Sequence, residues 1–136
     1  MRNNIAHASF KSDLSVLPKI QDFVGQAISE YKITSDRLDK ILLAVAEAAS
    51  NGIKHGNKSN TNIPLDVKIE KENNRLFIII SDNGKGFDPS TVPNPTEDEN
   101  ILKESGRGIF IIEKLVDKLS FNFSPTGTDT ILEIHI

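Results

Sequence analysis

The chain has 136 residues, a formal net charge of -3 at pH 7 and no cysteine. The lack of cysteine excludes disulfides, thiolate nucleophiles and zinc-thiolate centres, and the small negative charge leaves no broad basic field for nucleic acid or an anionic membrane. Hydrophobic residues make up 38% and charged residues 26% of the chain, so we expect one globular domain over residues 1–136. No apolar run is long enough to span a membrane, and the N-terminus lacks the apolar core of a signal peptide, which predicts a cytoplasmic protein.

The N-terminal half predicts a strand followed by two helices. Residues 5–10 have the composition of a short strand. Apolar residues then recur at helical spacing, which predicts a helix capped by Ser15 and ending near Tyr31. A second helix is expected to begin at Thr34 or Ser35 and to run to about Lys54, with acidic residues in its early turns.

The next segment predicts a hairpin after a cluster of turn-forming residues. Residues 65–70 alternate between apolar and charged side chains, which indicates a strand with one buried face. Asn73 and Asn74 mark the turn, and residues 76–80 are apolar on both sides, so this strand is expected at the centre of the sheet. Residues 88–105 predict a long irregular loop, either a functional lid or a disordered segment.

The C-terminal part predicts a third helix and two more strands. The helix is expected over 109–119, a strand over 121–123, and the last strand over 128–136 after a turn. The order β-α-α-β-β-loop-α-β-β predicts an α+β fold, a two-layer α/β sandwich. Its helices would lie on one face of a mixed, largely antiparallel sheet, leaving the other face to solvent or a subunit.

Polar residues at a spacing of four form the first candidate site. Glu47, Asn51 and His55 fall on one face of the second predicted helix, drifting by about 40° per step. The carboxylate of Glu47 suits a general base, and the carboxamide oxygen of Asn51 suits Mg²⁺. The alternatives are an exposed polar helix face for the first two and a helix-terminal residue for His55.

The second candidate site follows the central strand. Asp82 offers acceptor atoms at the strand end, where an adenine amino group could donate, and Gly84 and Gly86 let the backbone turn and approach a ligand. The alternative is an ordinary Asn-Gly turn.

Two further glycine motifs complete the pattern. Gly106 and Gly108 flank Arg107 at the start of the third predicted helix, where free N–H groups and a cation favour phosphate. Thr128 follows Gly127 into the last strand, and its hydroxyl could equally well bond only to the backbone. Each motif is weak singly, but their order along the chain points to a nucleotide site.

These motifs together resemble the superfamily of gyrase, heat-shock chaperone, histidine kinase and mismatch-repair ATPases. There is no P-loop signature and no Gly-x-Gly-x-x-Gly after a first strand. Within the superfamily, the chain is similar to the small anti-sigma factor serine kinases. That similarity is carried by LAVAEAASNGIKHGN, DNGKGFDPSTVPNP, ESGRGIFIIEKLVDKLSF and GTDTILEI.

The resemblance implies a role for each motif residue. Glu47 would be the base for a serine hydroxyl, Asn51 would hold Mg²⁺, and Asp82 would receive the adenine amino group of ATP. Thr128 would back the adenine. The remaining positions would surround the phosphates: Gly84, Gly86, Gly106, Arg107 and Gly108.

The chain departs from the family pattern at one position. Glu104 stands where members of the sporulation type commonly carry an arginine, which leaves Lys103 and Arg107 as candidates for the γ-phosphate contact. The implied partners are a sigma factor and an anti-sigma-factor antagonist, with a homodimer allowed and no direct contact with nucleic acid or membrane. Two alternatives remain: a non-catalytic module in which ATP gates a protein interface, and a detached ATP-binding domain of a histidine kinase. Against the second alternative, the 136 residues leave no room for the dimerising helix pair that would present a phosphoacceptor histidine.

Overall fold

A computed structural model describes residues 2–84 and 109–136 of the chain. The described strands are β1 (Asn3–Lys11), β2 (Pro64–Glu72), β3 (Arg75–Asp82), β4 (Lys118–Ser124) and β5 (Gly127–His135). The described helical segments are η1 (Leu14–Val16), α1 (Leu17–Ala27), α2 (Ser35–Asn51), η2 (Gly52–Gly56) and a helix over 109–115.

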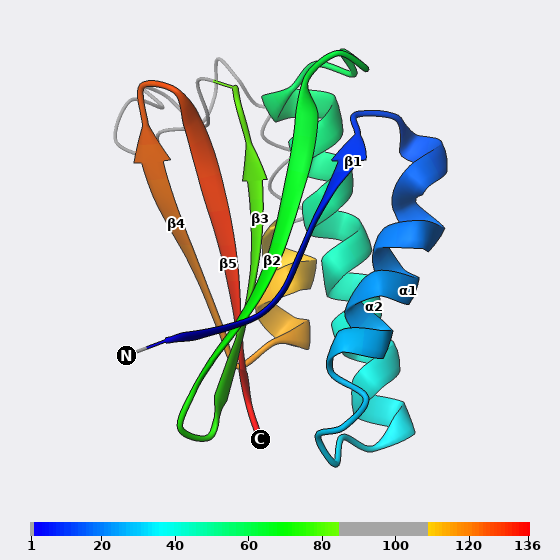
Figure 1. The fold of residues 1–136 in the computed structure, drawn as a ribbon, viewed down its shortest axis with the longest axis vertical. Coiled ribbons are helices and arrows are strands. Elements are labelled where there is room, and N and C mark those ends of the chain that lie inside the picture. The colour runs from blue at the N-terminus through cyan, green and yellow to red at the C-terminus, as the bar shows by residue number, and fades with distance from the viewer. Residues whose placement is uncertain (1, 85–108) are drawn as a thin grey trace.

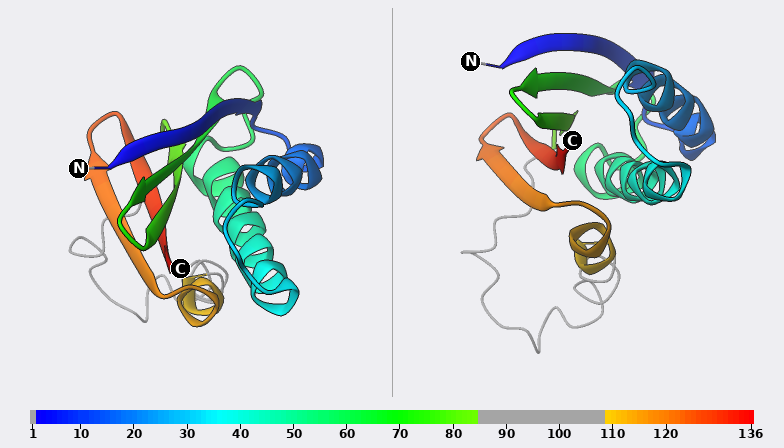
Figure 2. Two further views of the ribbon diagram at one scale, coloured as in Figure 1. Left: turned by 60° about the horizontal axis from the view of Figure 1, so that its bottom comes forward. Right: turned by 90° about the horizontal axis from the view of Figure 1, so that it is seen from below.

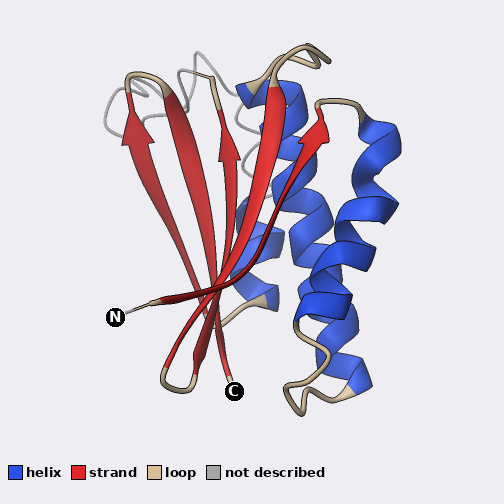
Figure 3. Cartoon of the chain, in the orientation of Figure 1, coloured by secondary structure: helices blue, strands red, loops and turns tan. Residues whose placement is uncertain are grey.

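The strands form one sheet in the order β1-β2-β3-β5-β4. Every pairing between neighbours is antiparallel, so the described sheet has no parallel part. The helices lie together on one face of the sheet, and the other face carries none of the described helices (Figures 1 and 2). The two-layer α/β sandwich predicted from the sequence is confirmed, with helices and strands in separate layers (Figure 3).

The core fills the space between the two layers. Its sheet side comes from alternate residues of the strands, because successive side chains of a strand point to opposite faces. Leu65, Val67 and Ile69 of β2 are fully buried, as their alternation with charged residues predicted. Ile41 and Val45 of α2 pack in the same cluster. The apolar face of the helix and the apolar face of the sheet are thus buried in one core.

The central position of β3 is also confirmed. Leu76, Ile78 and Ile80 belong to the main core, whereas Phe77 and Ile79 form a second buried cluster with Ile131 of β5. Apolar residues on both faces therefore accompany the middle position of β3 in the five-stranded order.

The first predicted helix differs from the structure at its N-terminus. Asp13, not Ser15, is the capping residue, because its side chain accepts a hydrogen bond from the Ser15 N–H at 3.0 Å. A 3₁₀ turn follows, and α1 proper ends at Ala27, before the predicted end near Tyr31. The predicted start of the second helix at Thr34 or Ser35 is confirmed, because α2 begins at Ser35. Thr34 caps it, with its hydroxyl accepting from the Arg37 N–H at 3.3 Å.

The third predicted helix is too long at its C-terminal end. The described helix stops at residue 115, and Leu119 already lies in β4 opposite Leu132 of β5. The chain passes from helix to strand at Asp117, which is bonded to β5. Its N–H donates to Glu133 O at 3.1 Å, and its carboxylate accepts from the His135 N–H at 2.7 Å. Leu119 is apolar at a position that suits either period, and pairing with β5 decides the outcome.

The expected loop over 88–105 lies outside the described residues. Within the described part of the chain, no helix is long and apolar enough to cross a membrane.

Candidate functional site

Asp82 lies at the end of the central strand β3, opposite Thr128 of β5. The residue is only 8% exposed, and one carboxylate oxygen accepts a hydrogen bond from the Gly84 N–H at 2.9 Å. The strand thus delivers a carboxylate to the edge of the core, and the following turn folds back onto it.

Burial raises the pKa of the Asp82 carboxyl above its ordinary value of 3.8. Hydrogen bonds from the backbone of Gly84 and Thr128 oppose this rise, and the nearby charge of Asp129 adds to it. None of the ion pairs among the described residues involves Asp82. A carboxylate has several acceptor positions, so Asp82 can accept a further hydrogen bond from a ligand beside those from the backbone.

Thr128 provides a second polar group at the same strand ends. It is 6% exposed, and its Oγ1 is the buried side-chain oxygen that has no hydrogen-bond partner among the described residues. An unsatisfied buried hydroxyl costs about 1–3 kcal/mol, so such groups occur mainly where a ligand or an ordered water completes them.

Glycines bring the end of the helical segment onto Asp82. A Cβ placed on Gly56 would lie 2.2 Å from the Asp82 Cγ, and one on Gly84 would lie 2.0 Å from the Gly56 carbonyl oxygen. A Cβ on Gly52 would come within 3.9 Å of the Asp82 carboxylate. No larger residue fits between η2 and the Asp82 turn without a shift of the backbone.

The neighbouring helix α2 carries the other two predicted side chains. Glu47 and Asn51 are both partly buried, one turn apart. Asn51 is the last residue of α2, directly before Gly52. Because Gly52 lies next to the Asp82 carboxylate, the end of α2 that bears Asn51 and the strand end that bears Asp82 are neighbours.

His55 follows α2 in a helical turn of a different type from the one that carries Glu47 and Asn51. After Asn51 the chain follows a π-helical turn over Gly52–Gly56, closed by the Asn57 N–H on the Gly52 carbonyl at 2.8 Å. A π turn closes i→i+5 hydrogen bonds and so contains more residues per turn than the α-helix before it. The His55 side chain is exposed.

Comparison with known proteins identifies the family of the chain. The profile of the histidine kinase-like ATPase domain matches residues 10–134, which is most of the chain. The chain belongs to the histidine kinase-like ATPase domain family. The strand end with Asp82 and Thr128 and the helix end with Asn51 all lie within the matched residues of this ATPase domain.

Curated relatives of the domain are serine kinases. Serine-protein kinase RsbW of Staphylococcus aureus is 35% identical over 102 residues, covering 70% of this chain and 64% of the relative. The same kinase in the Newman strain is 36% identical over 94 residues, covering 64% of this chain and 59% of the relative. The chain therefore spans somewhat less than two thirds of the length of these kinases.

Solved structures share the ATPase fold at low identity. The RsbU and RsbW domains of a Mycobacterium tuberculosis protein match with a TM-score of 0.68 and 14% identity, over 96% of this chain and 32% of theirs. The Acinetobacter baumannii histidine kinase AdeS matches with a TM-score of 0.52 and 12% identity, over 96% of this chain and 68% of its own. Both likenesses support the fold.

Several residues predicted to contact phosphate lie outside the part of the chain that the structure describes. Gly86, Lys103, Gly106, Arg107 and Gly108 lie outside the described residues, as does Glu104. In the described ranges, no group of three or more histidine, aspartate or glutamate side chains could hold a metal ion.

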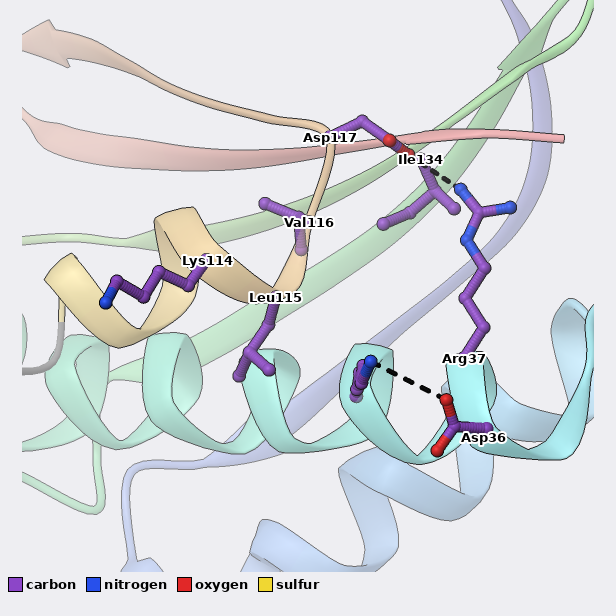
Figure 4. A pocket seen from close by; sticks show the side chains of 8 residues that line it. Asp36, Arg37, Lys114, Leu115, Val116, Asp117 and Ile134 are labelled. Atoms are coloured by element: carbon purple, nitrogen blue, oxygen red, sulfur yellow. Dashed lines mark hydrogen bonds and ion pairs between the residues drawn. The ribbon is translucent and has the colours of Figure 1, made fainter.

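A hollow of about 380 Å³ lies away from this site, between the start of α2, residues 114–117 and the end of β5 (Figure 4). Its charged side chains are largely paired with one another. Arg37 contacts Asp117 at 2.7 Å, and Lys40 contacts Asp36 at 3.5 Å. Asp82 and Thr128 are paired at one end of β3 and β5, whereas Ile134, which lines the hollow, lies near the other end of β5. The hollow is therefore separate from the candidate site.

The sequence analysis missed Gly56 and Asn57. Both fall in a run of turn-forming residues, and a glycine followed by asparagine at a helix end is typical of a helix terminus. The close approach of Gly56 to Asp82 and the contacts of Asn57 with distant residues appear only in the folded chain.

Proposed function

We propose that residues 1–136 form one ATP-binding domain that acts as an anti-sigma factor and protein serine kinase. It would sequester a sigma factor and phosphorylate an anti-sigma-factor antagonist on serine. The observation that carries the nucleotide part is the pairing at the strand ends of two buried polar groups: the Asp82 carboxylate, which has no ion-pair partner among the described residues, and Thr128 Oγ1, which has no hydrogen-bond partner there. The serine kinase names of relatives about 35% identical support the catalytic part.

The residues present fit an adenine nucleotide. The carboxylate of Asp82 would accept a hydrogen bond from the adenine amino group, and the Thr128 hydroxyl would gain the partner that it lacks within the described chain. Gly56 and Gly84 themselves place no side chain where η2 and the Asp82 turn meet. Gly84 would begin the phosphate contacts, continued by Gly86, Lys103, Gly106, Arg107 and Gly108.

Two side chains of α2 would serve the reaction. ATP, when bound, supplies the γ-phosphoryl group. Asn51 would offer its carboxamide oxygen to Mg²⁺, whose remaining ligands would be phosphate oxygens and water, as is usual for this ion. Glu47, one turn earlier, would accept the proton of the serine hydroxyl. Most of the catalysis would come from positioning and charge neutralisation.

Phosphorylation of a candidate antagonist with labelled ATP tests the kinase function. We expect phosphoserine on the antagonist with the wild-type protein, and a rate lower by about 100- to 10,000-fold with Glu47→Gln, because general-base loss has that size. Glu47→Gln should still bind MgATP, whereas Asn51→Ala should bind it more weakly, since a ground-state metal ligand is removed.

The same assay separates the alternative function. A non-catalytic module gated by ATP would bind the nucleotide and a protein partner but would transfer no phosphate. If Glu47→Gln phosphorylates the antagonist as fast as the wild-type protein, Glu47 is not the base. If the wild-type protein binds MgATP and yields no phosphoserine, the gated module is the better description.

A further inference from the structure

Asn57 is a buried amide whose polar atoms are bonded to three different segments. The residue is 2% exposed and follows η2 directly. Its Nδ2 donates to Ser12 Oγ at 2.9 Å and to the Pro64 carbonyl at 3.2 Å. Its Oδ1 accepts from the Asn83 N–H at 2.8 Å, across 26 residues of sequence. A side-chain amide is the group that can donate twice and accept at the same time.

These bonds tie the helix end to the ends of the central strands. Ser12 follows β1, Pro64 begins β2, and Asn83 follows β3. Ser12 is also fully buried, and its hydroxyl donates to the Ile63 carbonyl at 2.6 Å. Each buried polar atom of this network is satisfied by another, which makes the arrangement costly to rearrange.

The bond to Asn83 acts on the turn that carries the proposed adenine acceptor. Asn83 stands between Asp82 and Gly84, whose N–H donates to the Asp82 carboxylate. Its own side chain is exposed, so the backbone N–H is what the protein core holds. Gly56, the residue before Asn57, lies so close to the Asp82 carboxylate that a Cβ on it would be 2.2 Å from the Asp82 Cγ.

We propose that Asn57 is a positioning residue for base recognition, which holds the Asp82–Gly84 turn so that the Asp82 carboxylate selects adenine. The inference rests on the proposed ATP function, and it adds that selectivity for the 6-amino group depends on a side chain outside the binding surface. Loss of the Asn83 anchor frees the turn, and a carboxylate with more freedom pays a larger ordering cost when it binds the amino group.

Nucleotide titration of two matched variants tests this proposal. Asn57→Ala removes the bond to Asn83, whereas Ser12→Ala damages the same buried network without touching Asn83. The affinities of MgATP and magnesium inosine triphosphate, which has no 6-amino group, are measured by calorimetry. We expect the ratio of the two affinities to fall roughly tenfold in Asn57→Ala, the size of one charged hydrogen bond. In Ser12→Ala the ratio should stay at the wild-type value.

An unchanged ratio in folded Asn57→Ala would overturn the proposal, because general destabilisation affects both nucleotides alike. An equal fall in the ratio in both variants would also overturn it. Failure of the proposed function has a different signature, since the wild-type protein would then bind neither nucleotide or would not distinguish them.

Amide hydrogen exchange supplies a readout that needs no nucleotide. The Asn83 amide should be protected in the wild-type protein and in Ser12→Ala, and should exchange at least tenfold faster in Asn57→Ala. If Asn57→Ala does not fold, the wild-type measurement carries the test. Protection of the Asn83 amide close to that of the β3 amides supports the anchor, and exchange at the rate of an unstructured peptide overturns it.

Discussion

Asp82 combines burial with a proposed role as a charged hydrogen-bond acceptor. Desolvation raises the pKa of its carboxyl, which means that the folded, nucleotide-free protein is less stable with the group ionised than with it protonated. Groups at binding sites often carry such a cost, because the compensating partner arrives with the ligand.

Replacing Asp82 by Asn should therefore separate stability from binding. The free energy of unfolding of the nucleotide-free protein should increase at neutral pH, while the affinity for MgATP should fall by roughly 10- to 100-fold as a charged hydrogen bond is lost. Urea denaturation and calorimetry measure the two effects. A variant that binds MgATP as tightly as the wild-type protein would remove Asp82 from the adenine site.

The pH dependence of this variant follows from the direction of the pKa shift. The folded state holds the Asp82 proton more tightly than the unfolded state, whose pKa is near 3.8. The stabilisation that protonation supplies is complete below the unfolded pKa and is lost as the pH rises through the folded pKa. The stability advantage of Asp82→Asn over the wild-type protein should consequently grow as the pH rises from acidic to neutral.

At the scale of elements, the helical segment α2–η2 ends in a π turn that has a glycine at each end, Gly52 and Gly56. The π turn widens the helix where it meets the end of β3, and Gly56 allows its backbone to contact the Asp82 carboxylate. π turns inserted into helices are frequent at functional sites. Here the turn brings the amide of Asn57 into the core instead of leaving it exposed at a helix end.

Two glycine-to-alanine variants test how tightly this contact is packed. Gly56→Ala should destabilise the fold by about 1–3 kcal/mol and weaken MgATP binding, because its Cβ would overlap the Asp82 carboxylate at 2.2 Å. Gly25→Ala in α1 is the control, since its Cβ would meet nothing closer than 4.0 Å. It should stabilise the fold by about 0.5–1 kcal/mol through helix propensity. Neither glycine has a positive φ, so thermal denaturation compares the two variants without a contribution from left-handed backbone strain.

At the scale of the whole molecule, the proposed ligand site joins both layers of the sandwich. Asp82 and Thr128 belong to the sheet, and Asn51 belongs to the helical layer. A nucleotide that contacts both layers binds the folded chain and has no comparable site in the unfolded one. Its binding should therefore stabilise the entire fold.

Thermal denaturation with and without MgATP measures this coupling. At a nucleotide concentration about 100 times the Kd, the expected stabilisation is about 2.7 kcal/mol, which corresponds to a rise of several degrees in Tm. Asp82→Asn should show a much smaller rise at the same concentration. An unchanged Tm of the wild-type protein at saturating MgATP, together with no heat of binding, would contradict the nucleotide site.

The sequence by itself determined the layers of the fold and the family resemblance. Alternation over residues 65–70 and the helical repeat of α2 are local periods, and each predicts which face of its element is buried. The Asn73–Asn74 turn is local too, and Asn73 indeed adopts a positive φ between β2 and β3. Motif order along the chain was enough to point to the ATPase family, which the match over residues 10–134 established.

Only the tertiary structure decided where the third helix ends, that a π turn follows Asn51, and that Thr128 Oγ1 is buried without a partner among the described residues. The first depends on the hydrogen bonds of Asp117 to β5, and the second on the close packing of Gly52 and Gly56 against Asp82 of β3. The roles of Gly56 and Asn57 belong to the same class. Each is set by contacts between residues far apart in sequence, and the conformational preferences of a local segment carry no information about such partners.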